Sequence, residues 1–344
     1  MKRILATLGA CAIAVSMFAF AGCGEKSGYT EKSADEMVEI LKGIDTAKVL
    51  NLGDKNLGLT VEASGEFAYG TVMSGNGSAS AKLDLKLGEN FDLTAAGEAS
   101  AKASVSYKPY AEEPAREIEV DLTGKAYVEN SYVYAEAEGT LPFDEELEDA
   151  TCKFNYQQVL GAVMGSIGNL GGSVSLVAAE ESAPVDPVQY VLALASQVGV
   201  KFYVDNSDGL KVKVSATQDT VFGVLDYVAS QIEDEEAPAM IAEIKKSVTF
   251  NKFQFDVYFS LDKDGVFSEA GIDLDVDVKV AGELIQLISK SETAAPDFTA
   301  KAKLSVKLNT HNNKVTVPAG LAEDEKYYDI TEEILHAFND SDED

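Results

Sequence analysis

Residues 57–69 read LGLTVEASGEFAY, and apolar and polar side chains alternate along most of this stretch. The odd positions carry Leu, Leu, Val, Ala, Gly, Phe and Tyr, whereas the even positions include Thr60, Glu62, Ser64 and Glu66. A period of two is typical of a β-strand with one buried face and one wet face. The stretch therefore predicts a long strand in an antiparallel sheet.

The sequence that follows repeats this alternation in four further segments, at residues 79–87, 91–107, 118–128 and 133–139. Ser74–Gly77 and Glu129–Asn130 have the glycine and asparagine of tight turns, and Lys108–Arg116, with its two prolines, predicts a longer loop. Consecutive strands joined by short turns pair antiparallel, so we expect a meander. Its strands are longer than the usual five or six residues.

The apolar face of this meander is built from small residues in its middle and larger residues toward its ends. Gly65, Gly97, Gly124 and Gly139 fall within strands, where glycine often marks a bend. We therefore expect a strongly curved, half-barrel-like sheet.

Two interpretations of the small-residue face stay open. In the first, helices press on the face and the core is solid. In the second, the sheet and helices enclose a cavity for an apolar ligand. The floor of that cavity would consist of Ala81, Ala99, Ala101, Ala126 and Ala137.

Helical spacing dominates a middle segment of about residues 155–246, which we interpret as an insertion in the sheet. The apolar positions predict helices over 156–170, 188–198, 221–232 and 239–246, interrupted by a hairpin over 201–216. Another helix should open the body, because Ser33 and Glu36 have the spacing of a capping box.

The last third of the chain returns to strand patterns. Alternation predicts strands over 253–261, 270–280 and 300–308, a bulge near Asn251–Lys252, and a short edge strand over 315–318. The sequence thus predicts one α+β domain over residues 31–336, in which a curved antiparallel sheet of long strands is covered on one face by helices. The acidic tail, residues 337–344, is expected to be disordered.

The composition restricts the classes of binding partner that we expect for this protein. The chain has 344 residues and a formal net charge of −30. Such a surface repels phosphate backbones, so nucleic acid is not an expected partner. It would add no electrostatic attraction to an anionic membrane either.

The segment Met1–Cys23 has the layout of an export signal. Lys2 and Arg3 precede an apolar run, residues 4–20, and the segment ends Ala21-Gly22-Cys23. This ending resembles the lipobox of bacterial lipoproteins. The resemblance implies that residues 1–22 are removed, that Cys23 is acylated, and that residues 23–30 tether the body to the outer face of the cell membrane. An uncleaved membrane helix is the alternative, but a span needs about 20 apolar residues.

No catalytic, cofactor-binding or metal-binding constellation is visible, so we expect the protein not to be an enzyme and to need no cofactor. Cys152 has only His311 and His336 as potential bases, and both lie far along the chain. We interpret Cys152 as a partly buried, inert thiol. Residues 205–209 and 262–265 lack the ligand spacing of an EF-hand and are interpreted as turns.

The order of signal, opening helix, long meander, helical insertion and further strands resembles the LolA/LppX-like lipoprotein-carrier superfamily. Residues 313–318, NKVTVP, also look like the terminal strand of such lipoproteins. The resemblance implies a curved half-barrel closed by helices around a hydrophobic cavity. It favours a carrier that binds a lipid or another apolar or amphiphilic molecule at the cell envelope. The alternative is a structural or interaction lipoprotein, such as an adhesin or an envelope-complex subunit, with a solid core and no ligand.

Overall fold

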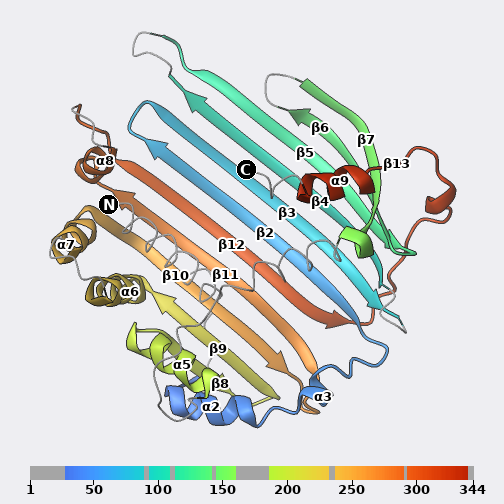
Figure 1. Ribbon diagram of the computed structural model, residues 1–344, viewed down its shortest axis with the longest axis horizontal. Coiled ribbons are helices and arrows are strands. Elements are labelled where there is room, and N and C mark those ends of the chain that lie inside the picture. The colour runs from blue at the N-terminus through green and yellow to red at the C-terminus, as the bar shows by residue number, and fades with distance from the viewer. Residues whose placement is uncertain are drawn as a thin grey trace.

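The structure is a computed structural model that describes residues 28–88, 93–108, 113–141, 145–159, 186–231, 237–289 and 293–339. Its main feature is an open ten-stranded sheet in the order β10-β11-β12-β2-β3-β4-β5-β6-β7-β13 (Figure 1). The strands are β10 (Val248–Leu261), β11 (Phe267–Val280), β12 (Phe298–His311), β2 (Asn56–Tyr69), β3 (Met73–Leu87), β4 (Leu93–Tyr107), β5 (Arg116–Glu129), β6 (Tyr132–Leu141), β7 (Glu145–Asn155) and β13 (Tyr328–Asp329).

Strands β2 to β6 form the antiparallel meander that the sequence predicts, and β7, which was not predicted, extends it by one further antiparallel strand. The predicted turn at Glu129–Asn130 is confirmed, because Asn130 and Ser131 have φ angles of 52° and 69°. The alternation holds in register across the strands, so that Leu59 lies opposite Leu83 and both belong to one continuous apolar face.

The turn predicted at Ser74–Gly77 is wrong. The chain reverses at Gly70, whose φ is 53°, and Val72 N donates to Tyr69 O at 3.1 Å. Gly75 lies inside β3 instead, where a Cβ would come within 2.6 Å of the Phe67 ring. Glycine is therefore used there for close approach to an aromatic neighbour rather than for a turn.

Near its C-terminus, the chain returns to pair with the first strand of the meander. Strand β12 pairs antiparallel with β2, and Lys301 forms an ion pair with Glu66, 235 residues away in the sequence. Strands β10 and β11 extend the sheet beyond β12. The predicted bulge in β10 is confirmed by a register shift between Phe250 and Lys252.

A second sheet, in the order β1-β8-β9, lies beside β10 (Figure 1). It consists of β1 (Thr30–Lys32), β8 (Lys201–Asp205) and β9 (Leu210–Thr217). At the junction, Asp256 of β10 is 1% exposed and accepts hydrogen bonds from Ser215 Oγ and Gln254 Nε2. Lys213 Nζ lies 4.0 Å from the same carboxylate. These polar contacts join the two sheets on their shared polar face.

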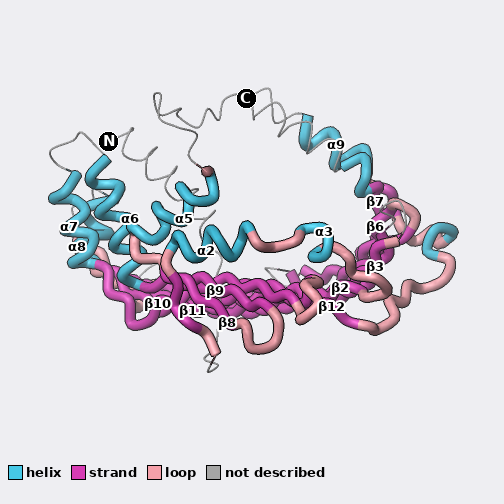
Figure 2. Tube along the Cα trace, turned by 90° about the horizontal axis from the view of Figure 1, so that it is seen from below, coloured by secondary structure: helices cyan, strands magenta, loops and turns pink. Residues whose placement is uncertain are grey.

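The described helices gather mainly on the apolar side of the β8–β10 end (Figure 2). Phe222 of α6 contacts Phe250 of β10 at a ring distance of 6.0 Å, and Met37 of α2 is buried against Phe202 and Val204 of β8. The helices are α2 (Ala34–Lys42), α3 (Thr46–Val49), α5 (Pro187–Gln197), α6 (Gln218–Gln231), α7 (Ala237–Ser247), α8 (Gly282–Ser289) and α9 (Thr331–Asn339), with a 3₁₀ turn η2 (Leu321–Glu323).

Local signals predict several of these helices correctly. Ser33 and Glu36 form the predicted capping box of α2. The side chain of Asp186 accepts from Val188 N, and Pro187 occupies the first turn of α5. Of the helix predicted over 156–170, residues 156–159 are helical and the remainder lies outside the described residues.

Other elements were not predicted. The acidic strand β7 was missed, as were helices α8 and α9 and the short strands β1 and β13. The edge strand expected over 315–318, and with it the likeness of 313–318 to a terminal strand, is wrong, because these residues form no strand. Val315 is buried and Val317 contacts an aromatic cluster, so side-chain burial explains the apolar pattern there.

The sheet bends toward the helix side at its β6–β7 end (Figure 2). The pairing of β6 with β7 shifts register between Ala137 and Gly139, and Gly139 has a φ of 142°. A Cβ there would collide with the carbonyl oxygen of Asp121 on β5. The predicted α+β fold, a large sheet accompanied by helices, is confirmed, and the structure shows that the sheet dominates it. In the described part of the chain, however, the main helix layer lies over one end of the sheet rather than over the whole face.

Candidate functional site

The five residues predicted as a cavity floor lie together on the apolar face of β3 to β6. Ala81 is opposite Ala99, Ala99 is opposite Gly124, and Gly124 is opposite Ala137, so these residues form one row across four strands. The neighbouring rows contain the other two predicted residues, Ala101 and Ala126. The structure thus brings the small residues together as the alternation requires.

We call the alanines and glycines in the middle of β3 to β6 the small-residue face. This face is partly exposed to solvent. Ala79, Ala99 and Ala103 are exposed, and Ala81 and Ala101 are half-buried. Larger side chains border it, and Phe67 stacks on Phe298 at a ring distance of 6.5 Å toward one end. The result is a broad apolar surface whose central side chains are small and whose bordering side chains are larger.

A cavity of about 760 Å³ lies on the opposite, polar face of the same strands. Four of its lining residues alternate in charge across the strands, in the order Lys82, Glu98, Lys125 and Glu136. Its other lining residues are Ser80, Ala99, Ser100, Thr123, Gly124, Ala137, Glu138, Thr151 and Lys326. Since successive side chains alternate between faces, the two alanines border this cavity through their backbone. It is a hydrophilic site with charges of both signs.

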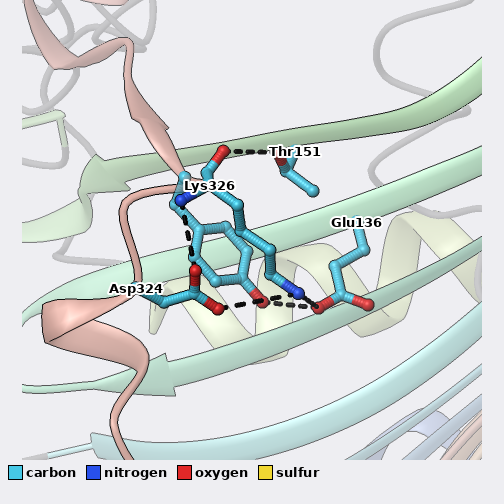
Figure 3. A network of polar contacts seen from close by, with 5 residues as sticks. Glu136, Thr151, Asp324 and Lys326 are labelled. Carbon is cyan, nitrogen blue, oxygen red and sulfur yellow. Dashed lines mark hydrogen bonds and ion pairs between the residues drawn. The ribbon is translucent and has the colours of Figure 1, made fainter.

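The C-terminal segment contributes Lys326 to the lining of this polar cavity and makes polar contacts with β6 and β7 (Figure 3). Lys326 Nζ lies 2.9 Å from Glu136 Oε1, and the hydroxyl of Tyr327 donates to the same oxygen at 2.5 Å. Thr151 Oγ1 donates to the Lys326 carbonyl at 2.6 Å. We call Glu136, Thr151, Lys326 and Tyr327 the C-terminal clamp.

Burial and hydrogen bonding set the electrostatics of the clamp. The Tyr327 hydroxyl, followed by the Lys326 ammonium, holds the pKa of Glu136 below its usual range. Burial, together with the Glu136 carboxylate, raises the pKa of Tyr327 to about 12. Both shifts favour a Glu136 carboxylate that stays ionised beside a neutral Tyr327.

An aromatic cluster anchors the clamp to β6. Tyr134 is 2% exposed and meets the Tyr327 ring edge-on at 5.2 Å, while Leu321 of η2 packs beside them. Sequence reasoning missed this site. The signal available was the apolar and aromatic content of residues 315–330, part of which was interpreted as an edge strand.

We expect Glu136→Gln to loosen the C-terminal segment by about 1 kcal/mol, because the variant loses an ion pair and a charge-assisted hydrogen bond that are both partly exposed. Hydrogen exchange at residues 321–330 would measure the change. The matched control is Glu138→Gln, since Glu138 is exposed on the same strand face and accepts a longer bond, at 3.3 Å, from Thr123 Oγ1.

The same clamp should depend on pH. Because the pKa of Glu136 is lowered by folding, its stabilisation is complete above the pKa of an unfolded Glu, about 4.3, and is lost as the pH falls through the lower folded value. Equal exchange at residues 321–330 in wild type and Glu136→Gln at neutral pH would contradict this account.

The candidate nucleophile and bases are placed apart. Cys152 lies on β7, and burial raises the pKa of its thiol, which disfavours the reactive thiolate. His311 ends β12, six strands away in the sheet order, with Nε2 lying 3.1 Å from Asp84 Oδ1 and Nδ1 accepting from Asn313 N. His336 is exposed on α9.

The two acidic turns at 205–209 and 262–265 are held by their own backbone contacts. Asp262 Oδ1 accepts from Asp264 N and Val266 N, and Asp205 Oδ1 accepts from Ser207 N. Among the described residues, His, Cys, Asp and Glu side chains form no group of three that could hold a metal ion. None of the described helices is long and apolar enough to cross a bilayer.

Comparison with known proteins gives no family. No family model matches the chain, and no curated protein matches it. Among solved structures, similarity extends to a beta-barrel-like protein of a domain of unknown function from Brucella abortus, with 9% identity, coverage of 74% of this chain and 98% of that chain, and a TM-score of 0.21. The translocator domain of the autotransporter NalP from Neisseria meningitidis shows 8% identity, covers 80% of this chain and 93% of its own, and has a TM-score of 0.18. Scores this low carry no argument about fold or function.

Proposed function

We propose that the protein is a lipoprotein of the extracytoplasmic membrane face that binds an apolar or amphiphilic molecule and performs no chemistry on it. Cys23 carries the lipid, and the small-residue face of β3 to β6 receives the apolar part of the ligand. In this proposal the bent sheet acts as a half-barrel-like platform rather than as the floor of a solid core.

The anchor rests on the segment Met1–Cys23, where a basic start, an apolar run and the ending Ala-Gly-Cys occur in the order of a lipoprotein signal. The net charge of −30 supports a covalent lipid as the attachment, since it gives the body no electrostatic affinity for anionic membranes.

The observation that carries the binding proposal is the exposure of the small-residue face. Ala79, Ala99 and Ala103 are exposed at the centre of an apolar surface that runs across the sheet. Exposed apolar patches of this kind commonly mark binding sites. Small side chains also leave room for an alkyl chain or ring to lie close to the strands.

Ala101→Leu tests the site. Ala101 is half-buried between Ala79 and Leu122 of the neighbouring strands. If the face binds ligand, the added side chain should weaken binding of an environment-sensitive apolar dye roughly fivefold, about 1 kcal/mol, and leave the melting temperature nearly unchanged. Ser78→Leu adds a leucine of the same size to an exposed position on the opposite face and should leave dye binding intact.

The alternative, a structural or interaction lipoprotein with a solid core, predicts the reverse. Overpacking a dense core typically costs about 1–3 kcal/mol, so Ala101→Leu would lower stability. The carrier proposal would be overturned by two results together. Ala101→Leu would be destabilised, and the wild type would bind no dye and yield no apolar compound on solvent extraction and mass spectrometry.

A further inference from the structure

The polar cavity on β3 to β6 is electrically balanced in a strongly acidic chain. Its described lining includes three lysines and three glutamates, whereas the chain as a whole has a net charge of −30. Lys82, Glu98 and Lys125 lie opposite one another on β3, β4 and β5, and we call them the charge row. The cavity therefore presents ammonium and carboxylate groups side by side rather than one sign of charge.

Elsewhere on this face of the sheet, opposite charges on neighbouring strands pair directly. Lys102 Nζ lies 2.6 Å from Asp121 Oδ2, and these residues are directly opposite in the register. Lys301 Nζ lies 2.6 Å from Glu66 Oε1 in the same arrangement. In the charge row, by contrast, the described part of the chain supplies no ion pair within 4.0 Å and no hydrogen bond to any of the three side chains. All three are exposed and free to pair with a ligand.

The carboxylate that follows the charge row is already engaged. Glu136 lies opposite Lys125, but it accepts from the Tyr327 hydroxyl and pairs with Lys326 in the C-terminal clamp. The charges left for a ligand thus run positive, negative, positive across three strands, and neighbouring strands are about 4.8 Å apart. A ligand that matches this order carries an ammonium between two carboxylates.

A row of hydroxyls lies beside the charge row. Ser80, Ser100 and Thr123 are opposite one another, two residues away from the charged side chains on each strand, and we call them the hydroxyl row. Ser80 Oγ lies 3.0 Å from Ser100 Oγ, and Thr123 Oγ1 donates to Glu138 Oε1 at 3.3 Å. Because a hydroxyl can both donate and accept, this row can bind either the N–H or the C=O of a peptide group.

The order of the charges excludes simpler ligands. A neutral molecule would cover the charge row without supplying counterions, and a covered charge without a partner is costly. A dianion without an ammonium would meet the Glu98 carboxylate, and a dication would meet both lysines, so like charges would repel one another. Specificity at this cavity therefore depends on the unfavourable pairings as well as on the favourable ones.

We propose that the polar cavity binds a short peptide whose free ammonium lies between two carboxylates, as in a dipeptide that begins with an acidic residue. The ammonium pairs with Glu98, the carboxylates pair with Lys82 and Lys125, and the peptide group bonds to the hydroxyl row. The volume of about 760 Å³ is within the range of small-molecule sites, about 300–1,000 Å³. The cavity lies on the face opposite the small-residue face, so this site is independent of the proposed apolar ligand.

Titration calorimetry of the full-length chain with the dipeptide glutamylglycine tests the site. The ammonium of this probe lies between its side-chain carboxylate and its C-terminal carboxylate. Three related peptides each lack one charge: alanylglycine lacks the side-chain carboxylate, N-acetyl-glutamylglycine lacks the ammonium, and glutamylglycinamide lacks the C-terminal carboxylate. We expect each of them to bind about fivefold more weakly than glutamylglycine, the effect of one partly exposed ion pair.

Glu98→Gln assigns the ammonium to its partner, since it removes the charge and keeps the size of the side chain. It should weaken glutamylglycine about fivefold and should not weaken the N-acetylated peptide, which has no ammonium to lose. The matched control is Lys102→Gln, because Lys102 is exposed on the same face of β4 but does not line the cavity. It should leave the affinity for all four peptides unchanged. Thermal melts by circular dichroism check that both variants are folded.

Three results would overturn the proposal. The first is no binding of glutamylglycine at millimolar concentration, and the second is equal affinity of the wild type for all four peptides. The third is an equal effect of Glu98→Gln and Lys102→Gln, because the peptide would then respond to the charge of the whole sheet face rather than to the cavity. None of these results bears on the apolar site, which is tested separately by dye binding to Ala101→Leu.

Discussion

Cys23→Ala should remove the protein from the membrane almost completely. The variant has no thiol to acylate, and each buried CH₂ of a lipid chain contributes about 0.8 kcal/mol of membrane affinity. With a net charge of −30 the body has no electrostatic means of replacing that affinity. Phase partitioning in a detergent that separates on warming would show wild type in the detergent phase and the variant in the aqueous phase.

The chain provides its own control for this experiment. Cys11 lies within the apolar run of the signal, so Cys11→Ala should leave partitioning unchanged. A Cys23→Ala protein that still partitions with membranes as wild type does would show that Met1–Cys23 is not a lipoprotein signal. An uncleaved membrane helix would then explain the apolar run.

Asp256→Ala is expected to destabilise the fold by about 3–5 kcal/mol, because removing one partner leaves a buried charge without its counterion. Asp256 is 1% exposed, and the side chain of Lys213 is only 15% exposed. Ser215 Oγ and Gln254 Nε2 also lose their acceptor. Since these contacts join β9 to β10, the smaller sheet and its helices should separate first. Urea unfolding followed by circular dichroism would measure the loss.

The control for Asp256 is an ion pair that is closer but exposed. Lys102 Nζ lies 2.6 Å from Asp121 Oδ2, and both side chains are at least half exposed. Asp121→Ala should therefore change the free energy of unfolding by less than about 1 kcal/mol. A similar loss in both variants would mean that burial at the sheet junction does not determine the contribution of Asp256.

Local patterns were enough to predict most of the sheet, since a period of two is visible within a single strand and short turns make neighbours antiparallel. The pattern failed at Gly75 and at β7 for two different reasons. Gly75 was interpreted as part of a turn, but it is a glycine because the Phe67 ring lies against it. Strand β7 was missed because it begins with EELED, whose four carboxylates hide the apolar pattern of Leu147, Ala150 and Cys152.

Of the two candidate sites, one was predicted from the sequence and the other was not. The small-residue face was predicted from the strands themselves, and the register places its residues together. The C-terminal clamp could not be predicted, because it depends on residues 321–327 returning to β6 from 190 positions further along the chain. Nothing in the sequence near Glu136 indicates that partner.

The pairing of β12 with β2 has a consequence for the order in which the protein can be assembled. The meander from β2 to β7 uses contacts between neighbouring segments, which form quickly, whereas joining β2 to β12 closes a loop that contains most of the chain. A chain that folds while it is released N-terminus first therefore holds the inner edge of β2 unpaired until β12 arrives, and bare strand edges are templates for association. A chain that stopped short of β12 would consist of two half-sheets, one ending in the 14 residues of β2 and the other in the 14 residues of β11, each with a free edge.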